Sequence, residues 1–285
     1  MLRILFFASF AALVLGQSTD VVVPAKAPKP QTKIVGGQVT SANAWPWQAS
    51  LRAQSSMCYN HVCGGVLIKA QWNILSCSVL NVPSKKNLAT NQRQCLFLCL
   101  SESGKEQFYG VSATYIHPSW NRDLTAGNDI GLIRLTSPAT LNSYIQLAPL
   151  PSLNQILSRG TTCYATGWGT TQTGGLLSAQ LRQAYLPSVD YATCSSSTWW
   201  GSVAKSNMIC AGGTGAASIC TADGGGPLNC LVGGRYVVHG LSSFVSSLGC
   251  NVVYKPSVFT RVSAYLTWVQ SVSRNIILCI LFGIW

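Results

Sequence analysis

Acidic residues are scarce in this chain. Its 285 residues include 7 Asp and Glu against 19 Lys and Arg, so the formal net charge of +12 reflects missing acids more than added bases. The basic residues are scattered, and no stretch gathers them into a cluster. A protein that binds nucleic acid needs a basic face or cluster, so we expect no nucleic acid as a partner.

Histidine is also rare, and Cys-x-x-Cys pairs are missing altogether. The three histidines, His61, His117 and His239, lie far apart in the sequence. Metal sites in proteins often draw on closely spaced Cys and His ligands. The sequence therefore predicts neither a metal ion nor a cofactor.

Apolar runs long enough to cross a bilayer, which takes about 20 residues, are missing as well. The run at residues 4–15 follows Arg3 and precedes Gly16. This layout is typical of a secretory signal peptide, which we place at residues 1–16. Residues 275–285 form a short apolar tail, and we expect no membrane attachment.

Cysteine is abundant by contrast. Twelve cysteines behind a signal peptide indicate an oxidising compartment, in which thiols pair as disulfides. We therefore expect a secreted, extracellular protein with disulfide bonds.

Short β-branched and aromatic segments fill the chain from residue 34 onward, broken by Gly, Pro, Asn and Ser. This pattern predicts an all-β sandwich or barrel. Apolar residues at helical spacing occur at residues 262–272, where we expect a terminal helix.

Residues 220–228 read Cys-Thr-Ala-Asp-Gly-Gly-Gly-Pro-Leu, a backbone that lets another group approach closely. The segment resembles the active-site loop of the trypsin-like serine peptidases, Gly-Asp-Ser-Gly-Gly-Pro. Further segments resemble the pancreatic elastase branch of that family, among them Trp-Pro-Trp-Gln at 45–48, Thr-Gly-Trp-Gly at 166–169 and Ser-Phe-Val-Ser-Ser at 243–247. The resemblance implies two six-stranded antiparallel β-barrels with a C-terminal helix, which we assign to residues 34–274.

Two members of the family's catalytic triad are missing. Asp129 matches the triad Asp, but Gly224 holds the place of the nucleophilic Ser, and residues 75–79 read Leu-Ser-Cys-Ser-Val where the family has Thr-Ala-Ala-His-Cys. This chemistry needs a hydroxyl, an imidazole and a carboxylate in a row. Losing the nucleophile or the base costs on the order of a million-fold in rate, so we expect an inactive protein.

The residues of the binding cleft match the family's pattern better than the catalytic residues do. By resemblance, the oxyanion donors are the N–H groups of Ala222 and Gly224. Ala222 replaces a Gly, and a positive φ there would cost roughly 1 kcal/mol. By resemblance too, a specificity pocket without an acidic base, suited to small apolar side chains of a peptide or protein ligand, is lined by Ser218, Ile219, Ser243, Val245 and Ser257. These walls are equally expected if the fold keeps them only for packing.

Residues 17–33, rich in Pro and Lys, bury too little to fold alone and are expected to form a propeptide. Lys33 is followed by Ile34-Val35-Gly36-Gly37, which resembles the family's activation junction. The resemblance implies a zymogen in which an activating protease cuts after Lys33, and the new amino group of Ile34 pairs with Asp223. A buried ammonium and a buried carboxylate each need the other.

The family's bridges imply four disulfides, Cys63 with Cys77, Cys163 with Cys230, Cys194 with Cys210 and Cys220 with Cys250. The pairing of the other four cysteines stays open, since connectivity does not follow from sequence alone: Cys58, Cys95, Cys99 and Cys279.

Three hypotheses follow. The first is a secreted, inactive elastase-like homologue that binds a peptide or an inhibitor in its cleft. The second is an active elastase-type serine endopeptidase whose sequence has been misread around Ser76 and Gly224. The third is the nonfunctional product of a decaying gene.

Overall fold

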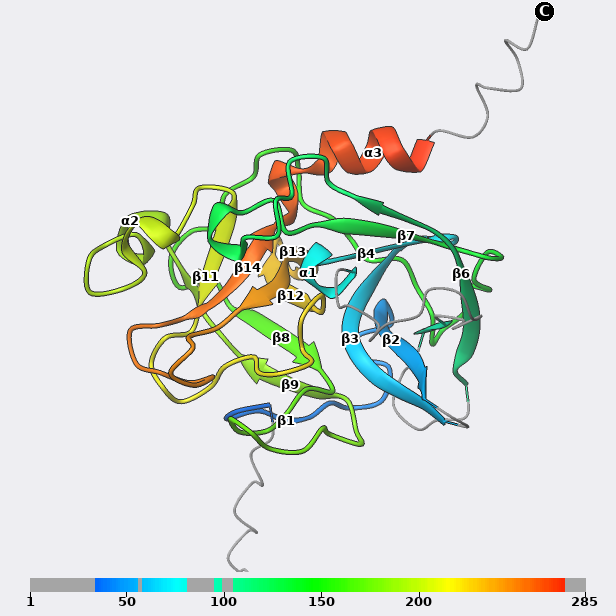
Figure 1. Cartoon of the computed structure of the whole chain (residues 1–285), viewed down its shortest axis with the longest axis horizontal. Coiled ribbons are helices and arrows are strands. Elements are labelled where there is room, and N and C mark those ends of the chain that lie inside the picture. Colours follow the sequence, from blue (N-terminus) through cyan, green and yellow to red (C-terminus); the bar gives the residue numbers. More distant parts are fainter. Residues whose placement is uncertain (1–33, 56–57, 81–94, 99–104, 275–285) are drawn as a thin grey trace, which may run out of the picture. The chain divides into compact units, whose positions relative to one another are not determined.

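The computed structural model (Figure 1) describes four ranges of the chain, residues 34–55, 58–80, 95–98 and 105–274. The predicted signal peptide, the propeptide with Lys33 and the C-terminal tail lie outside these ranges. No helix within the described ranges is both long and apolar enough to span a membrane.

Six antiparallel strands close into a barrel in the order β2-β3-β4-β7-β6-β5. Alternate residues of a strand face the same side, and Leu51, Leu67 and Ile133 meet in an apolar cluster. The strands are β2 (Gln48–Ser55), β3 (Cys58–Lys69), β4 (Trp72–Leu75), β5 (Cys95–Leu98), β6 (Gln107–Ile116) and β7 (Gly131–Leu135).

Eight antiparallel strands form a second, curled sheet in the order β1-β9-β8-β12-β13-β14-β11-β10. Ile34, Leu228 and Phe259 are fully buried in its apolar cluster. The strands are β1 (Gln38–Val39), β8 (Cys163–Gly167), β9 (Arg182–Tyr185), β10 (Ser188–Val189), β11 (Met208–Ala211), β12 (Pro227–Val232), β13 (Arg235–Phe244) and β14 (Ser257–Arg261).

The predicted all-β fold of two antiparallel barrels is confirmed by these two sheets. The second sheet has two strands more than expected, because the two-residue strands β1 and β10 pair onto β9 and β11 at its ends. The strands expected from β-branched and aromatic segments are present because such side chains pack well on a half-buried pleated surface.

Helices are few in the described residues. Helices α1 (Cys77–Leu80) and α2 (Tyr191–Cys194) have four residues each, whereas α3 (Leu266–Arg274) has nine. The predicted terminal helix is confirmed, although it is preceded by a separate 3₁₀ turn, Val262–Ala264. Leu266 and Val269 bury the apolar side of α3 in the core.

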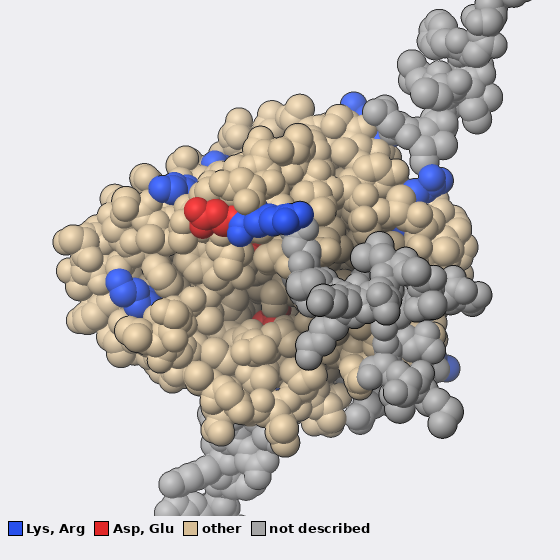
Figure 2. All heavy atoms as spheres, in the orientation of Figure 1, with Lys and Arg blue, Asp and Glu red and all other residues tan. Residues whose placement is uncertain are grey.

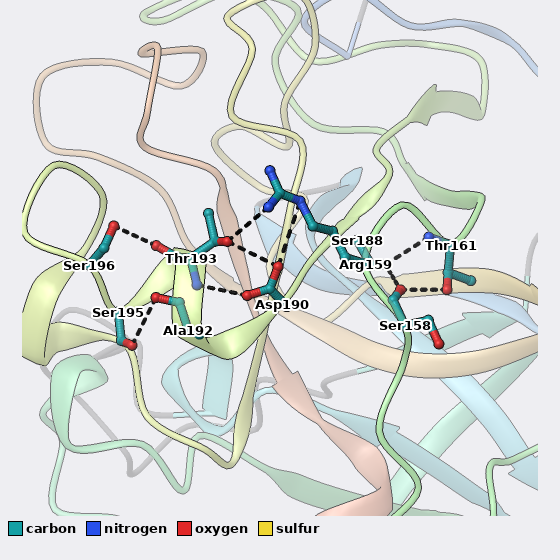
Figure 3. A network of polar contacts seen from close by, with 9 residues as sticks. All are labelled: Ser158, Arg159, Thr161, Ser188, Asp190, Ala192, Thr193, Ser195 and Ser196. Atoms are coloured by element: carbon teal, nitrogen blue, oxygen red, sulfur yellow. Dashed lines mark hydrogen bonds and ion pairs between the residues drawn. The ribbon is translucent and has the colours of Figure 1, made fainter.

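A polar network fixes the start of α2 (Figure 3). The carboxylate of Asp190 accepts hydrogen bonds from the Thr193 N at 2.7 Å and the Thr193 Oγ1 at 3.0 Å. The Arg159 Nε lies 3.6 Å from the same carboxylate. These bonds form a helix cap, and the exposed ion pair adds little to it.

One apolar cluster joins the two halves of the fold. It contains Trp47 and Ile74 from the first barrel together with Val238 and Leu241 from β13. The Trp47 Nε1 also donates a 2.8 Å hydrogen bond to the Asn229 Oδ1 across the junction. This packing brings β12, and the loop that leads into it, against the first barrel.

Three of the four predicted disulfides are present, Cys163–Cys230, Cys194–Cys210 and Cys220–Cys250. The first crosses the paired strands β8 and β12, where the two residues lie opposite one another. The third ties the loop at residues 220–228 to the segment after β13.

The predicted Cys63–Cys77 disulfide is wrong, because Cys63 is a free, buried thiol. The residues on either side of Cys77, Ser76 and Ser78, both hydrogen-bond to Asp129. These contacts hold the segment in place. Burial raises the pKa of the Cys63 thiol to about 12, with a smaller contribution from the Asp129 charge.

Candidate functional site

Asp129 lies in a buried cluster of hydroxyl groups just before β7 and is 1% exposed. Its Oδ2 accepts hydrogen bonds from the Ser76 Oγ at 2.6 Å and the Ser243 Oγ at 2.5 Å. Ser78 donates from its N to Oδ1 at 2.6 Å and from its Oγ to Oδ2 at 3.1 Å. Neutral donors thus satisfy both oxygens, and none of the histidines in the described ranges hydrogen-bonds to this carboxylate.

His61, on β3, contacts the loop at residues 220–228 instead. Its Nε2 donates to the Ala222 carbonyl oxygen at 3.0 Å, which fixes the neutral tautomer, and its Nδ1 accepts from the Ser50 Oγ at 2.7 Å. Burial, assisted by the Arg52 charge and opposed by the hydrogen bond to Ala222, lowers the pKa of His61 to about 4. With both ring nitrogens engaged, His61 supports the loop and has no free lone pair to act as a base.

The other two histidines also serve the packing. His117 lies edge-on against Tyr265 and Trp268, with ring centroids 5.2 and 5.0 Å away. His239 is fully buried in β13, where burial lowers its pKa to about 4. Neither position matches the base expected of the triad.

The loop presents two backbone N–H groups, at Ala222 and Gly224. The Thr221 carbonyl accepts from the Thr170 N at 2.8 Å, and the Asp223 carbonyl accepts from the Gly226 N at 3.0 Å. In a trans peptide the N–H points opposite to the C=O, so the amides of Ala222 and Gly224 point away from these partners. Within the described part of the chain neither amide donates a hydrogen bond.

Ala222 adopts a φ of 69°, in the left-handed region that favours glycine. The strain expected of a side chain here is therefore present. Two hydrogen bonds fix the peptides on either side of this residue, since His61 donates to the Ala222 carbonyl oxygen and Thr170 to that of Thr221.

Asp223 belongs to the same loop, and its side chain is fully buried. Its carboxylate accepts hydrogen bonds from the Gly169 N at 2.8 Å and the Cys220 N at 2.9 Å. Burial outweighs these bonds and raises the pKa of Asp223 to about 7. A Cβ on Gly167 or Gly169 would come within 2.5 Å of this carboxylate, so only glycine fits at either position.

Ile34, the residue after the predicted cleavage site, is buried in the second sheet, and Val35 forms a β-bridge with Ser218. Within the described ranges the structure records no ion pair for Asp223. Lys33 lies outside those ranges.

Three of the predicted pocket residues, Ser218, Ile219 and Ser257, are in contact with one another. The Ser218 Oγ donates to the Ile219 carbonyl at 2.8 Å and lies 2.9 Å from the Ser257 Oγ. The Ile219 N in turn donates to the Ser257 Oγ at 3.2 Å. Ser243 and Val245 follow at the end of β13, with Ser243 at a register shift against β14. These five residues are all uncharged.

The face shown in Figure 2 is hollowed near its middle, and most of its surface carries no charged side chain. No group of three or more His, Cys, Asp or Glu residues suited to a metal ion occurs in the described ranges.

Sequence reasoning assigned no role to Ser76, Ser78 or His61. The two serines replace the family's histidine segment and bind Asp129, and His61 supports the Ala222 peptide. No signal in the sequence pointed to His61, because its contact with Ala222 depends on how β3 packs against the loop at residues 220–228.

Comparison with known proteins identifies the same family that the fold indicates. The family model described as Trypsin matches residues 34–269. The chain is 47% identical to chymotrypsin-like elastase family member 1 from Bos taurus over 95% of this chain and 98% of that protein. For the Homo sapiens protein of the same name the identity is 47%, over 86% of this chain and 94% of that protein.

Proposed function

Because the chain belongs to the elastase branch of the trypsin family of serine peptidases, we propose that it is a secreted homologue that does not hydrolyse peptide bonds. Instead it binds a peptide or protein ligand in its cleft. The family's own activity rests on a nucleophile and a base, and each loss alone removes nearly all of the rate enhancement.

The surroundings of Asp129 carry this proposal. A triad carboxylate orients an imidazole, yet the oxygens of Asp129 are occupied by Ser76, Ser78 and Ser243. A serine hydroxyl is too weak a base to take a proton from a nucleophile. Gly224 offers no hydroxyl in any case, so even a displaced histidine would find nothing to activate.

His61 does not replace the missing base. Its Nε2 carries the proton that it donates to the Ala222 carbonyl, and its Nδ1 accepts from Ser50. A pKa of about 4 also leaves it far less basic than a catalytic histidine at neutral pH.

The proposal that the protein binds a ligand rests on two backbone amides and on the predicted pocket residues. The amides of Ala222 and Gly224 are unengaged within the described residues, and the pocket walls around Ser218 and Ser257 are neutral and hydrogen-bonded. Such a site suits a small apolar side chain beside a polar group of the ligand backbone. Val245 adds an apolar wall at the end of β13.

Secretion and activation complete the proposal. A signal peptide at residues 1–16 and the twelve cysteines favour the extracellular space. An activating protease would cut after Lys33 and free the amino group of Ile34 for Asp223. The buried Asp223 carboxylate, which has only amide partners among the described residues, is the group that such an ammonium would neutralise.

The test is an assay of the recombinant protein after cleavage at Lys33, with a small-residue ester as substrate. We expect no turnover above a heat-killed control and no labelling by a phosphonate that traps the nucleophilic serine, while the bovine relative, treated alike, gives both. Turnover or a covalent adduct would overturn the proposal. Sequencing the transcript across Ser76 and Gly224 tests the hypothesis of a misread active peptidase.

A further inference from the structure

Ile34 is buried in the fold although the sequence continues through Lys33 in front of it. Its side chain is 0% exposed in the apolar cluster of the second sheet. The Gly37 N donates to the Ile34 carbonyl at 2.7 Å, and the Ser218 N donates to the Val35 carbonyl at 3.0 Å. The segment that follows the predicted cleavage site is therefore in place in the uncleaved chain.

The backbone of Ile34 is strained in this position. Its φ of 40° lies in the left-handed region, which β-branched residues rarely adopt. Burying an isoleucine side chain stabilises a fold by about as much as one such residue costs, or by more. Burial of the side chain thus holds the segment, and a free amino group is not required for it.

The Asp223 carboxylate has hydrogen-bond donors that do not depend on cleavage. Its Oδ1 accepts from the Gly169 N at 2.8 Å, and its Oδ2 accepts from the Cys220 N at 2.9 Å. Burial raises the pKa of Asp223 to about 7, and a protonated carboxyl needs no cation beside it. In the zymogen that the family resemblance implies, this group pairs with the freed amino group of Ile34. In the uncleaved chain, two backbone amides and protonation limit the cost of its burial instead.

Contacts from both halves of the fold fix the loop at residues 220–228. On the side of the first barrel, the Gly64 N of β3 donates to the Gly224 carbonyl at 2.9 Å. On the side of the second sheet, the Gly225 N donates to the Ser242 carbonyl of β13 at 2.8 Å. None of these bonds depends on a cut in the chain.

We propose that the loop at residues 220–228 and the pocket wall at Ser218 are fully assembled in the uncleaved chain, so that cleavage after Lys33 does not switch ligand binding on. This rests on the proposed function, since it concerns the regulation of the same cleft. Cleavage then changes the charge partner of Asp223 and leaves the course of the loop as it is. The protein binds its ligand as soon as it has folded.

The experiment compares amide hydrogen exchange, measured by NMR, in the Lys33-cleaved parent and in a Lys33→Gln variant that stays uncleaved after the same protease treatment. N-terminal sequencing verifies that the cleaved product begins at Ile34. The reporters are the amides of Gly169, Cys220 and Gly225, which hold the loop, and the amides of β7 serve as the reference.

We expect the exchange rates of the reporters to agree within about threefold between the cleaved and uncleaved proteins, because the same hydrogen bonds protect them in both. A greater slowing on cleavage would show that the loop becomes ordered only after the cut and would overturn the inference. That result leaves the proposed function standing. The untreated parent, compared with Lys33→Gln, controls for the substitution itself.

Binding of fluorophore-labelled tetraalanine, followed by fluorescence anisotropy, gives the functional readout. We expect dissociation constants within about threefold for the cleaved parent and the uncleaved Lys33→Gln variant. Binding by the cleaved protein alone overturns the inference but agrees with the proposed function. Absence of binding by both proteins contradicts the proposed function, and the exchange rates then decide the inference by themselves.

Discussion

The Ser76 hydroxyl donates a 2.6 Å hydrogen bond to the Oδ2 of Asp129, and both residues are buried. A charged carboxylate in the interior is costly unless it is well hydrogen-bonded. Ser76 is therefore a structural partner of Asp129, and its loss leaves a buried charge with one donor fewer.

Replacing Ser76 with alanine tests this partnership. We expect Ser76→Ala to lower the free energy of unfolding by about 1–3 kcal/mol, measured by urea unfolding. Ser196→Ala removes an exposed hydroxyl and serves as the control, with an expected change below about 0.5 kcal/mol. Equal losses in the two variants would contradict the role of Ser76.

Ala222 lies at a φ of 69°, where a Cβ is strained. We expect Ala222→Gly to raise the free energy of unfolding by about 1 kcal/mol, because glycine adopts this conformation without strain. Ala165→Gly, in the buried strand β8, is the control and should destabilise the protein. Thermal unfolding measures both, and a Tm for Ala222→Gly below that of the parent would argue against strain at this residue.

The raised pKa of Asp223 predicts that the difference in stability between the uncleaved parent chain and its Asp223→Asn variant depends on pH. Its pKa rises from the ordinary 3.8 to about 7 on folding, so its contribution to stability is fully present below about pH 3.8 and is lost as the pH rises to about 7. We therefore expect the stability of Asp223→Asn, relative to the parent, to increase between pH 4 and pH 7 and then level off.

The measurement is urea unfolding of both proteins across this pH range. The pKa values of His61 and His239 are also shifted, from 6.5 to about 4. Their contribution to the stability of the protein is therefore lost as the pH falls from 6.5 to about 4. Both proteins contain these histidines, so their contribution cancels in the difference. A difference that does not change with pH would show that Asp223 titrates normally.

Cys63 should react slowly with thiol reagents. Its thiol is buried and its pKa is raised to about 12, so little thiolate exists at neutral pH. We expect no alkylation by iodoacetamide in the native protein and complete alkylation after unfolding without reductant. Peptide mapping by mass spectrometry is the measurement, and a disulfide-linked Cys63–Cys77 peptide would refute the free thiol.

The sequence by itself determined the fold and most of the framework of the site. Short β-branched and aromatic segments predicted an all-β sandwich or barrel, because strand propensity is a local property, and the family resemblance implied the two antiparallel barrels. The motif around Gly224 and the three cysteine pairs that form were also readable, since each depends on residue type and family resemblance. The absence of a nucleophilic hydroxyl at Gly224 needed no structure at all.

Only the tertiary structure decided what replaced the missing groups. Ser76 and Ser243 are 167 residues apart, yet both donate to Asp129, because the two halves of the fold pack at this carboxylate. The same packing places His61 against the Ala222 peptide and leaves Cys63 unpaired. Such contacts depend on where two sheets meet, and no local pattern in the sequence records that.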